Sequence, residues 1–338
     1  MKKFLIIKPS GIGDIVHSLP VAITIKRILP QSEIHWLVFS KFSSILRNTD
    51  YIDKAIQWDR DGGIREYFRV LSLVRKERYD VSIDLQGLMR TALINSFSRA
   101  KSKLSVSLLR EGSWLFERPV SKYDKNQHAV ERNYEVVRAL FKGKEIPSPI
   151  ESLPWIKVTE EEKQKAEEIL DEEEKVVVFN VSSRGEHKIW PAKNFAKLIN
   201  LMYEEYGTIP VFLGTLEERL LVERVEIGLS CRSINLVGKT DLRVACGIIE
   251  RSRMVVGNDS GLTHISAALN KPVLAIFGAT NPVWFYPYNE KSKYIYKEYK
   301  CSPCGIKPRC KDYKCMLDIS VEEVFEFVKS YFSVYLVD

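Results

Sequence analysis

Two short loops near opposite ends of the chain contain residue types suited to anion chemistry. The first is Ser10-Gly11-Ile12-Gly13-Asp14, and the second is Asp259-Ser260-Gly261-Leu262-Thr263-His264. Each loop follows a strand-like apolar run and opens an apolar-periodic helix, where backbone N–H groups converge on an anion in α/β proteins. The pair predicts two nucleotide-fold halves facing each other, and a cleft enzyme that joins an acceptor to a phosphate-bearing donor.

The first loop offers a carboxylate that could act as a general base. Ser10, Gly11 and Gly13 let the backbone turn tightly, but the loop lacks the third glycine of the dinucleotide fingerprint and the Gly-Lys-Ser/Thr ending of a P-loop. Asp14 stands where strand becomes helix, and a carboxylate there can deprotonate an attacking hydroxyl held within about 3 Å. The alternative is an ordinary acidic residue of a first helical turn, favoured by the helix dipole.

Polar residues after strands of the second half suit a bound diphosphate. Ser182 and Ser183 end an apolar run, and Lys188 follows in the next loop. Hydroxyls and a lysine at that place can bind phosphate oxygens and stabilise a departing phosphate, although a solvated polar loop is the alternative. Glu217 and Glu218 offer a carboxylate for ribose hydroxyls, or are simply helix-start residues.

The second loop contains two residue types common at helix starts and two that helix capping does not require. Asp259 and Ser260 are ordinary N-cap residues, but capping alone does not explain Gly261 together with His264 one turn into the helix.

Four of the six cysteines are closely spaced. Cys301, Cys304, Cys310 and Cys315 could hold zinc through thiolates, or could be simply buried in an ordered loop. Without a recognisable signal sequence, a disulfide framework is not expected. Cys231 and Cys246 lie in apolar-periodic segments and are interpreted as small core residues.

Length and composition indicate a soluble protein of two domains. The chain has 338 residues, a hydrophobic content of 45% and a net charge of +7. The length suits two cores, and no apolar run approaches the roughly 18 residues of a membrane helix. The positive charge favours anionic partners such as nucleotides, phosphorylated glycolipids or a membrane leaflet, and a merely basic enzyme is the alternative.

Apolar runs alternate with amphipathic stretches through both halves. Continuous apolar runs are typical of strands buried on both faces of a parallel sheet, so the chain is predicted to be α/β with two doubly wound domains. The segment from Gly143 to Pro154 is interpreted as the linker. The predicted strands are Phe4–Ile7, Ile34–Phe39, Ala55–Trp58, Val81–Leu85, Val176–Asn180, Pro210–Leu213, Met254–Gly257 and Pro272–Phe277.

Several of these stretches resemble the bacterial lipopolysaccharide heptosyltransferases, the ninth glycosyltransferase family. The matching stretches run in order along the chain: Lys8 to Pro20, Asp84-Leu85-Gln86-Gly87-Leu88, Lys188-Ile189-Trp190-Pro191, Asp259 to His264, Phe277 to Thr280, and the segment from Cys301 to Met316. The resemblance implies a GT-B fold of two Rossmann-like domains facing across a cleft. It implies an acceptor-binding domain over residues 1–150 and a nucleotide-sugar domain over 151–338, whose last helix packs back on the first domain.

The resemblance also implies the reaction and the roles of residues. It implies inverting transfer of heptose from ADP-heptose to the lipopolysaccharide inner core, with no obligatory metal or cofactor. Asp14 would be the base, beside the acceptor-side loop of Ser10, Gly11 and Gly13, and Lys188 would act on the leaving phosphate. The implied donor-binding residues are Ser182, Ser183, Lys188, Glu217 or Glu218, Thr240, Asp259, Ser260, Gly261 and His264.

Other functions stay open on the sequence alone. They are a transferase of the same fold that uses another nucleotide sugar for a surface glycan, an epimerase of related build, and a scaffold on acidic glycolipid. Basic and aromatic residues at 99–103 and 110–116 favour peripheral contact with the cytoplasmic face of the inner membrane, unless these charges are only solvated. No nucleic-acid partner is expected.

Overall fold

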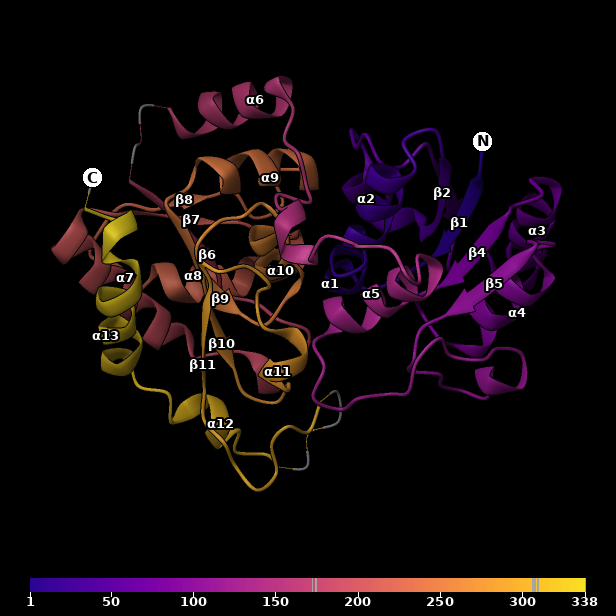
Figure 1. Ribbon diagram of the computed structural model, residues 1–338. Helices are drawn as coiled ribbons and strands as arrows, with labels where there is room; N and C mark the ends of the chain where they lie inside the picture. The colour runs from indigo at the N-terminus through magenta and orange to yellow at the C-terminus, as the bar shows by residue number, and fades with distance from the viewer. Residues whose placement is uncertain (172, 174, 306–307, 309, 338) are drawn as a thin grey trace. The chain divides into compact units, whose positions relative to one another are not determined.

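The computed structural model describes residues 1–171, 173, 175–305, 308 and 310–337, and divides into two compact units, Met1–Lys157 and Val158–Asp338 (Figure 1). Each unit is a parallel sheet with helices on both faces. This arrangement confirms the predicted α/β fold of two doubly wound halves.

The first unit contains a five-stranded sheet of order β3-β2-β1-β4-β5. Every neighbouring pair is parallel, with Phe4 of β1 opposite Ile34 of β2 and Val81 of β4. Alternate side chains of the central strand face opposite layers, and both sets are buried, which is why the run from Phe4 to Ile7 is continuously apolar. The strands are β1 (Lys3–Ile7), β2 (Glu33–Phe39), β3 (Lys54–Trp58), β4 (Val81–Asp84) and β5 (Ser102–Ser105).

Two layers of helix cover this sheet. Helices α2 and α5 contact each other on one face, and α3 contacts α4 on the other (Figure 1). The helices are α1 (Ile12–Val16), α2 (Leu19–Ile28), α3 (Gly63–Lys76), α4 (Met89–Phe97) and α5 (Ala129–Leu140), with 3₁₀ turns η1 (Ser40–Leu46), η2 (Ser113–Leu115) and η3 (Pro149–Ser152).

The second unit contains a six-stranded parallel sheet of order β11-β10-β9-β6-β7-β8. Strands β6 and β9 are central, so the loops after them leave the same edge of the sheet. The strands are β6 (Val176–Asn180), β7 (Ile209–Phe212), β8 (Ile234–Asn235), β9 (Met254–Asn258), β10 (Val273–Phe277) and β11 (Lys293–Tyr296).

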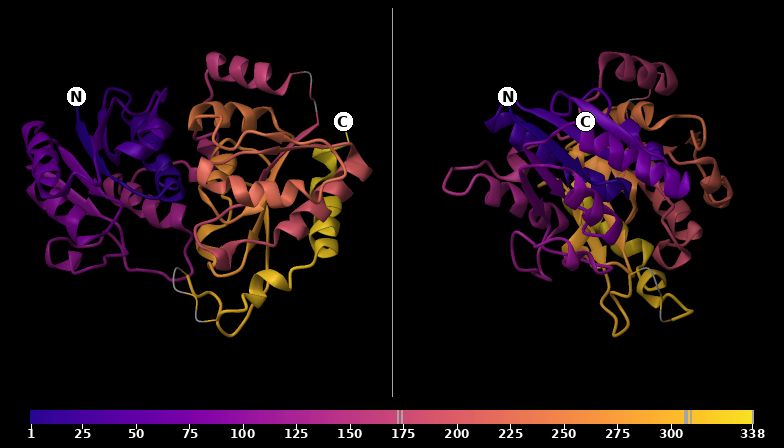
Figure 2. Two further views of the ribbon diagram at one scale, coloured as in Figure 1. Left: turned by 180° about the vertical axis from the view of Figure 1, so that it is seen from behind. Right: turned by 90° about the vertical axis from the view of Figure 1, so that its right-hand side faces the viewer.

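Helices also cover both faces of the second sheet. Helix α7 packs against α8 and α13 on one face, and α6 lies alongside α9 on the other (Figure 2). The buried residues of α7, α8 and α13 belong to one core, which includes Phe195, Val225 and Val328. The helices are α6 (Glu160–Leu170), α7 (Ala192–Tyr206), α8 (Arg219–Glu226), α9 (Leu242–Arg251), α10 (Gly261–Ala268), α11 (Pro282–Phe285), α12 (Lys314–Leu317) and α13 (Val321–Phe332), with 3₁₀ turns η4 (Glu186–Lys188), η5 (Leu216–Glu218) and η6 (Ser333–Tyr335).

All eight predicted strands are present, with bounds that differ by no more than a residue or two. Val324, Val328 and Phe332 of α13 are fully buried in the core of the second unit, against α7.

Candidate active site

Asp14 lies in the first turn of α1, just beyond the carboxyl end of β1. Its side chain is 46% exposed, so the carboxylate is accessible from solvent. Gly11 has a φ of 74°, and a Cβ on it would overlap Asp14 Oδ2. A glycine is therefore required at position 11 both by the backbone conformation and by the carboxylate that folds back over the turn.

The backbone of Asp14 is fixed from α5. Ser18 Oγ donates to the carbonyl oxygen of Asp14 at 2.8 Å, and Asn133 Nδ2 donates to Ser18 Oγ at 2.9 Å. Both bonds lie largely out of solvent, where polar groups must be satisfied by protein partners. The loop that carries Asp14 is thus tied to a helix more than a hundred residues later in the chain.

A buried lysine that the sequence analysis gave no role lies beside Asp14. Lys8 is 5% exposed, donates from Nζ to the carbonyl oxygen of Leu85 at 2.7 Å, and lies 4.0 Å from Asp14 Oδ1. Burial lowers the pKa of this ammonium, while the charges of Asp14 and Asp84 oppose the shift. Lys8 therefore links the ends of β1 and β4 and places positive charge next to the proposed base.

Asp84 and Glu117 form a buried acidic pair that the sequence analysis also missed. Asp84 Oδ1 accepts from the backbone N–H groups of Gln86 and Gly87 at 2.7 and 3.2 Å, which shapes the turn after β4. Burial raises the pKa of Asp84, and burial together with the nearby Asp84 charge raises the pKa of Glu117 to about 9. Glu117 is consequently protonated at neutral pH.

In the second unit, Asp259 draws Lys188 and His264 together. It follows β9, and its two carboxylate oxygens lie 3.1 Å from Lys188 Nζ and 3.3 Å from His264 Nε2. Burial opposes the ionisation of Asp259, but the hydrogen bond from His264 and the charges of His264 and Lys188 outweigh it, so the pKa is held well below its usual range. The structure thus brings Lys188 of one predicted loop together with Asp259 and His264 of another.

The two serines after β6 lie at the same edge of the sheet as Asp259. Ser183 Oγ donates to the carbonyl oxygen of Asp259 at 2.6 Å, and Ser182 Oγ donates to Glu218 Oε1. The other carboxylate oxygen of Glu218 accepts from Thr215 N at 2.6 Å, whereas Glu217 is exposed. Of the two glutamates, Glu218 is the one that lies beside the predicted phosphate-binding residues.

Thr240 follows a turn that is bonded to the loop carrying the glutamates. Gly238 N donates to the carbonyl oxygen of Gly214 at 2.9 Å. The loops after β7 and β8 are therefore neighbours, and Thr240 lies two residues beyond this contact.

Ser260 and Gly261 form the start of α10. Ser260 is the N-cap, but its side chain makes no capping hydrogen bond to the helix. Asn180 Nδ2 instead donates to Ser260 Oγ, and to Thr263 Oγ1 at 3.1 Å. The first N–H groups of α10 are therefore left without a serine cap at the edge where Asp259 lies.

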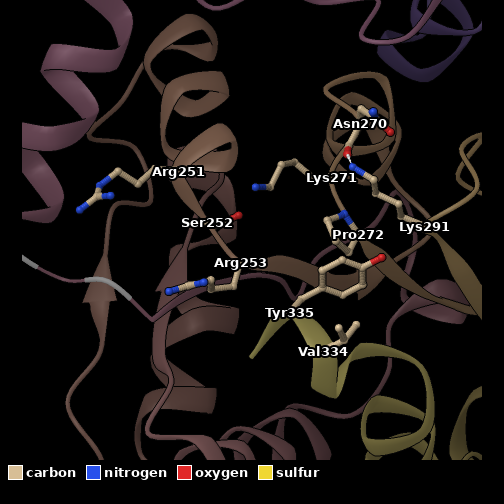
Figure 3. A pocket seen from close by; sticks show the side chains of 9 residues that line it. All are labelled: Arg251, Ser252, Arg253, Asn270, Lys271, Pro272, Lys291, Val334 and Tyr335. Atoms are coloured by element: carbon tan, nitrogen blue, oxygen red, sulfur yellow. Dashed lines mark hydrogen bonds between the residues drawn. The ribbon is translucent and has the colours of Figure 1, made fainter. Parts of the chain in front are cut away.

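A cavity of about 550 Å³ lies elsewhere in this unit (Figure 3). Lys271 borders it and donates to the carbonyl oxygen of Glu250 near the end of α9, at 3.0 Å. None of the predicted site residues lines this cavity, whose walls are Arg251, Ser252, Arg253, Asn270, Lys271, Pro272, Lys291, Val334 and Tyr335.

The clustered cysteines are free thiols, of which Cys315 is buried and the other three are half-buried. Within the described ranges, no three histidine, cysteine or acidic side chains are arranged to hold a metal ion, so the zinc alternative gains no support. Of the other two cysteines, Cys246 is fully buried as predicted, and Cys231 packs partly buried against the core. Across the same described residues, no helix is long and apolar enough to cross a bilayer.

Two doubly wound units with polar groups gathered at the carboxyl ends of their central strands are the two Rossmann-like halves of the GT-B fold. Residues 67–314 match glycosyltransferase family 9 (heptosyltransferase), and the chain belongs to this family. It is 32% identical to lipopolysaccharide heptosyltransferase 1 of Campylobacter coli over 82% of this chain and 84% of that protein. The predicted family and enzyme class are confirmed.

Solved structures show the same fold. The chain is similar to ADP-heptose lps heptosyltransferase II of E. coli, with a TM-score of 0.80, 24% identity and coverage of 99% of both chains. It is also similar to E. coli heptosyltransferase WaaC with ADP-2-deoxy-2-fluoro heptose, with a TM-score of 0.73, 21% identity and coverage of 97% of this chain and 99% of that one.

Proposed function

We propose that this heptosyltransferase transfers heptose from ADP-heptose to the inner core of lipopolysaccharide, by an inverting displacement. The match to the Campylobacter coli lipopolysaccharide heptosyltransferase and the ADP-heptose analogue in the similar WaaC structure support this substrate pair. The observation that carries the proposal is the buried Asp259 with Lys188 and His264, beside Ser183 and the start of α10.

The second unit is the proposed donor domain. Lys188 and the N–H groups that begin α10, at Gly261, would stabilise the negative charge that develops on the departing ADP. Ser182 and Ser183 would bind phosphate oxygens, with Asp259, Ser260 and His264 around the diphosphate and sugar. We expect no obligatory divalent metal, because the lysine and the helix start supply positive charge.

The nucleoside of the donor would lie against the loops after β7 and β8. We assign the ribose hydroxyls to Glu218 rather than Glu217, because Glu218 alone of the two is bonded to Ser182. The bond between the Gly214 and Gly238 turns supports placing the adenine at the backbone near Thr240.

The first unit is the proposed acceptor domain, and Asp14 is the proposed base. As the acceptor hydroxyl oxygen forms its bond to the anomeric carbon, the bond from that carbon to the ADP oxygen breaks and the hydroxyl proton passes to Asp14. The backbone of the turn formed by Ser10, Gly11 and Gly13 would contact the acceptor. Lys8 would hold the Asp14 carboxylate in position. A general base contributes about 10²- to 10⁴-fold to the rate.

The Asp14→Asn variant tests this assignment. Turnover with ADP-heptose and acceptor should fall by roughly 10²- to 10⁴-fold, while calorimetric affinity for ADP-heptose stays unchanged. Asp50→Asn is the matched control, since Asp50 is 67% exposed and pairs with the exposed Lys157 at the surface. Undiminished turnover in Asp14→Asn would remove Asp14 from the mechanism.

A nucleotide screen tests the donor. Ligands that bind only the folded state raise the melting temperature, so ADP should stabilise the protein more than UDP or GDP. Stronger stabilisation by UDP or GDP would indicate the alternative, a transferase that uses another nucleotide sugar. We propose that the enzyme works as a peripheral protein at the cytoplasmic face of the inner membrane, because its acceptor is a glycolipid.

A further inference from the structure

The large apolar side chains exposed on the first unit gather in one part of it. The structure describes all of residues 1–157, and apart from Met1 every exposed large apolar side chain there belongs to residues 64–123. Ile64 and Leu115 are more than 70% exposed, and neither α2 nor α5 presents such a residue. The set comprises Ile64, Phe68, Leu73, Phe97, Trp114, Leu115, Phe116 and Tyr123.

The elements that carry these side chains adjoin one another. Helix α3 contacts α4, and α4 contacts η2 (Figures 1 and 2). Ser96 Oγ, near the end of α4, donates to the carbonyl oxygen of Phe116 at 3.1 Å. We define the docking face as the outward surface of α3, the end of α4 and η2.

Helix α3 is apolar on two sides. Val70 and Val74 are fully buried against the sheet, whereas Ile64 and Phe68 lie one turn apart and are 73% and 59% exposed. Packing of the helix against the sheet explains the apolar residues on its inner side, but not those on its outer side. Exposed apolar side chains gathered in this way mark an interaction surface.

The two chain segments that contain these elements are strongly basic. Residues 63–76 and 88–123 contain eleven Arg and Lys residues and three Glu residues. Their net charge of +8 exceeds the +7 of the whole chain, so the rest of the chain is close to neutral. Of the three glutamates, Glu66 is bonded to Arg69, and Glu117 is buried with its pKa raised to about 9.

A shallow cavity of about 400 Å³ lies on this face, and both apolar and basic side chains line it. Phe68 and Leu71 supply its apolar part, and three cations border it. Its lining is Phe68, Leu71, Ser72, Arg75, Lys76 and Arg99.

We propose that the docking face binds the surface of a bilayer that contains anionic phospholipids. Exposed aromatic and aliphatic side chains interleaved with basic ones suit the boundary between headgroups and acyl chains. The charge favours an anionic lipid surface, because clustered Lys and Arg residues are each attracted to anionic headgroups by about 1 kcal/mol. This inference rests on the proposed function for its purpose, which is to bring the enzyme to a membrane-embedded acceptor.

Two double variants test the two components of binding. Sedimentation with vesicles of phosphatidylglycerol and phosphatidylethanolamine measures affinity. Arg75→Ser with Lys76→Ser should weaken binding by about 30-fold, at about 1 kcal/mol for each basic residue, and Phe68→Ser with Trp114→Ser by tenfold or more. Ile227→Ser is the matched control, since Ile227 is 86% exposed on the second unit. Melting temperatures verify that each variant is folded.

The outcomes separate this inference from the proposed function. Both double variants should transfer heptose to a deacylated, water-soluble acceptor at the wild-type rate, and lose transfer only to acceptor in vesicles. The docking face would be overturned if both double variants bound anionic vesicles with wild-type affinity. It would also be overturned if Ile227→Ser lost as much affinity as the double variants, or if the wild type bound phosphatidylcholine vesicles as tightly as anionic ones. If the wild type transfers heptose to neither acceptor, the proposed function fails while vesicle binding still decides the docking face.

Discussion

Replacing Glu117 by Gln should change how the stability of the first unit depends on pH. Glu117 is 8% exposed, and Asn95 Nδ2 donates to its Oε1 at 2.5 Å. Burial and the neighbouring Asp84 raise its pKa to about 9. Glutamine keeps the acceptor oxygen and cannot ionise, so it imitates the protonated side chain.

The sign follows from the protons bound by each state. An unfolded glutamate loses its proton near pH 4.3, whereas folded Glu117 keeps it until about pH 9. In that window the folded state binds one more proton, so this group makes the free energy of unfolding fall as pH rises, by up to about 1.4 kcal/mol per pH unit. Below pH 4 the effect vanishes, because both states are protonated.

Glu117→Gln should therefore be more stable than the wild type at pH 8, and the advantage should shrink steadily toward pH 5. Because the chain divides into two compact units, hydrogen exchange of peptides covering residues 81–117 is a suitable measurement for the first unit by itself. Glu111→Gln is the control, since Glu111 is exposed. Parallel pH profiles for Glu117→Gln and the wild type would show that Glu117 ionises normally in the folded protein.

Two further variants probe the second unit. Lys188→Gln removes the cation 3.1 Å from Asp259, and kcat should fall by about 10²- to 10³-fold in a steady-state assay; a rise in KM alone would mean that Lys188 only binds the donor. Glu162→Gln disrupts the pair in which Glu162 accepts from Arg243 Nε at 2.8 Å and Nη2 at 2.7 Å, joining α6 to α9. Leaving Arg243 buried without its counter-charge should cost about 3–5 kcal/mol in urea unfolding, and a loss below 1 kcal/mol would contradict this role.

Strands of the two sheets were predictable where both of their faces are buried. Val176–Asn180 and Val273–Phe277 are buried throughout, so their sequences are continuously apolar. The missed strands β5, β8 and β11 end their sheets or are very short: β5 has the sequence Ser-Lys-Leu-Ser, and β8 has two residues. These strands are fixed by hydrogen bonds to a neighbour, which leave no signal in their own sequence, whereas the edge strand β3 was predictable from its apolar Ile56 and Trp58.

The site residues divide in a similar way. Asp14, Asp259 and His264 follow strands at turns into helices, so their spacing places them at the carboxyl edge of a sheet. Lys8 also follows a strand, but its burial and its bond to Leu85 depend on tertiary contacts, and Glu117 is placed beside Asp84 by tertiary contacts alone. The preference for Glu218 over Glu217 likewise depends on a hydrogen bond from another loop.

The two charged regions of the protein differ in how they can attract a ligand. At the proposed donor site the ionised Asp259 already balances Lys188, so little net charge is available for long-range attraction. Recognition of a diphosphate there has to depend on oriented donors such as Ser183 and the first N–H groups of α10, which act over hydrogen-bond distances. The segments that contain the docking face, residues 63–76 and 88–123, have a net charge of +8, and such charge acts over about a Debye length. We therefore expect long-range attraction to act between the docking face and the membrane surface, and short-range geometry to select the donor.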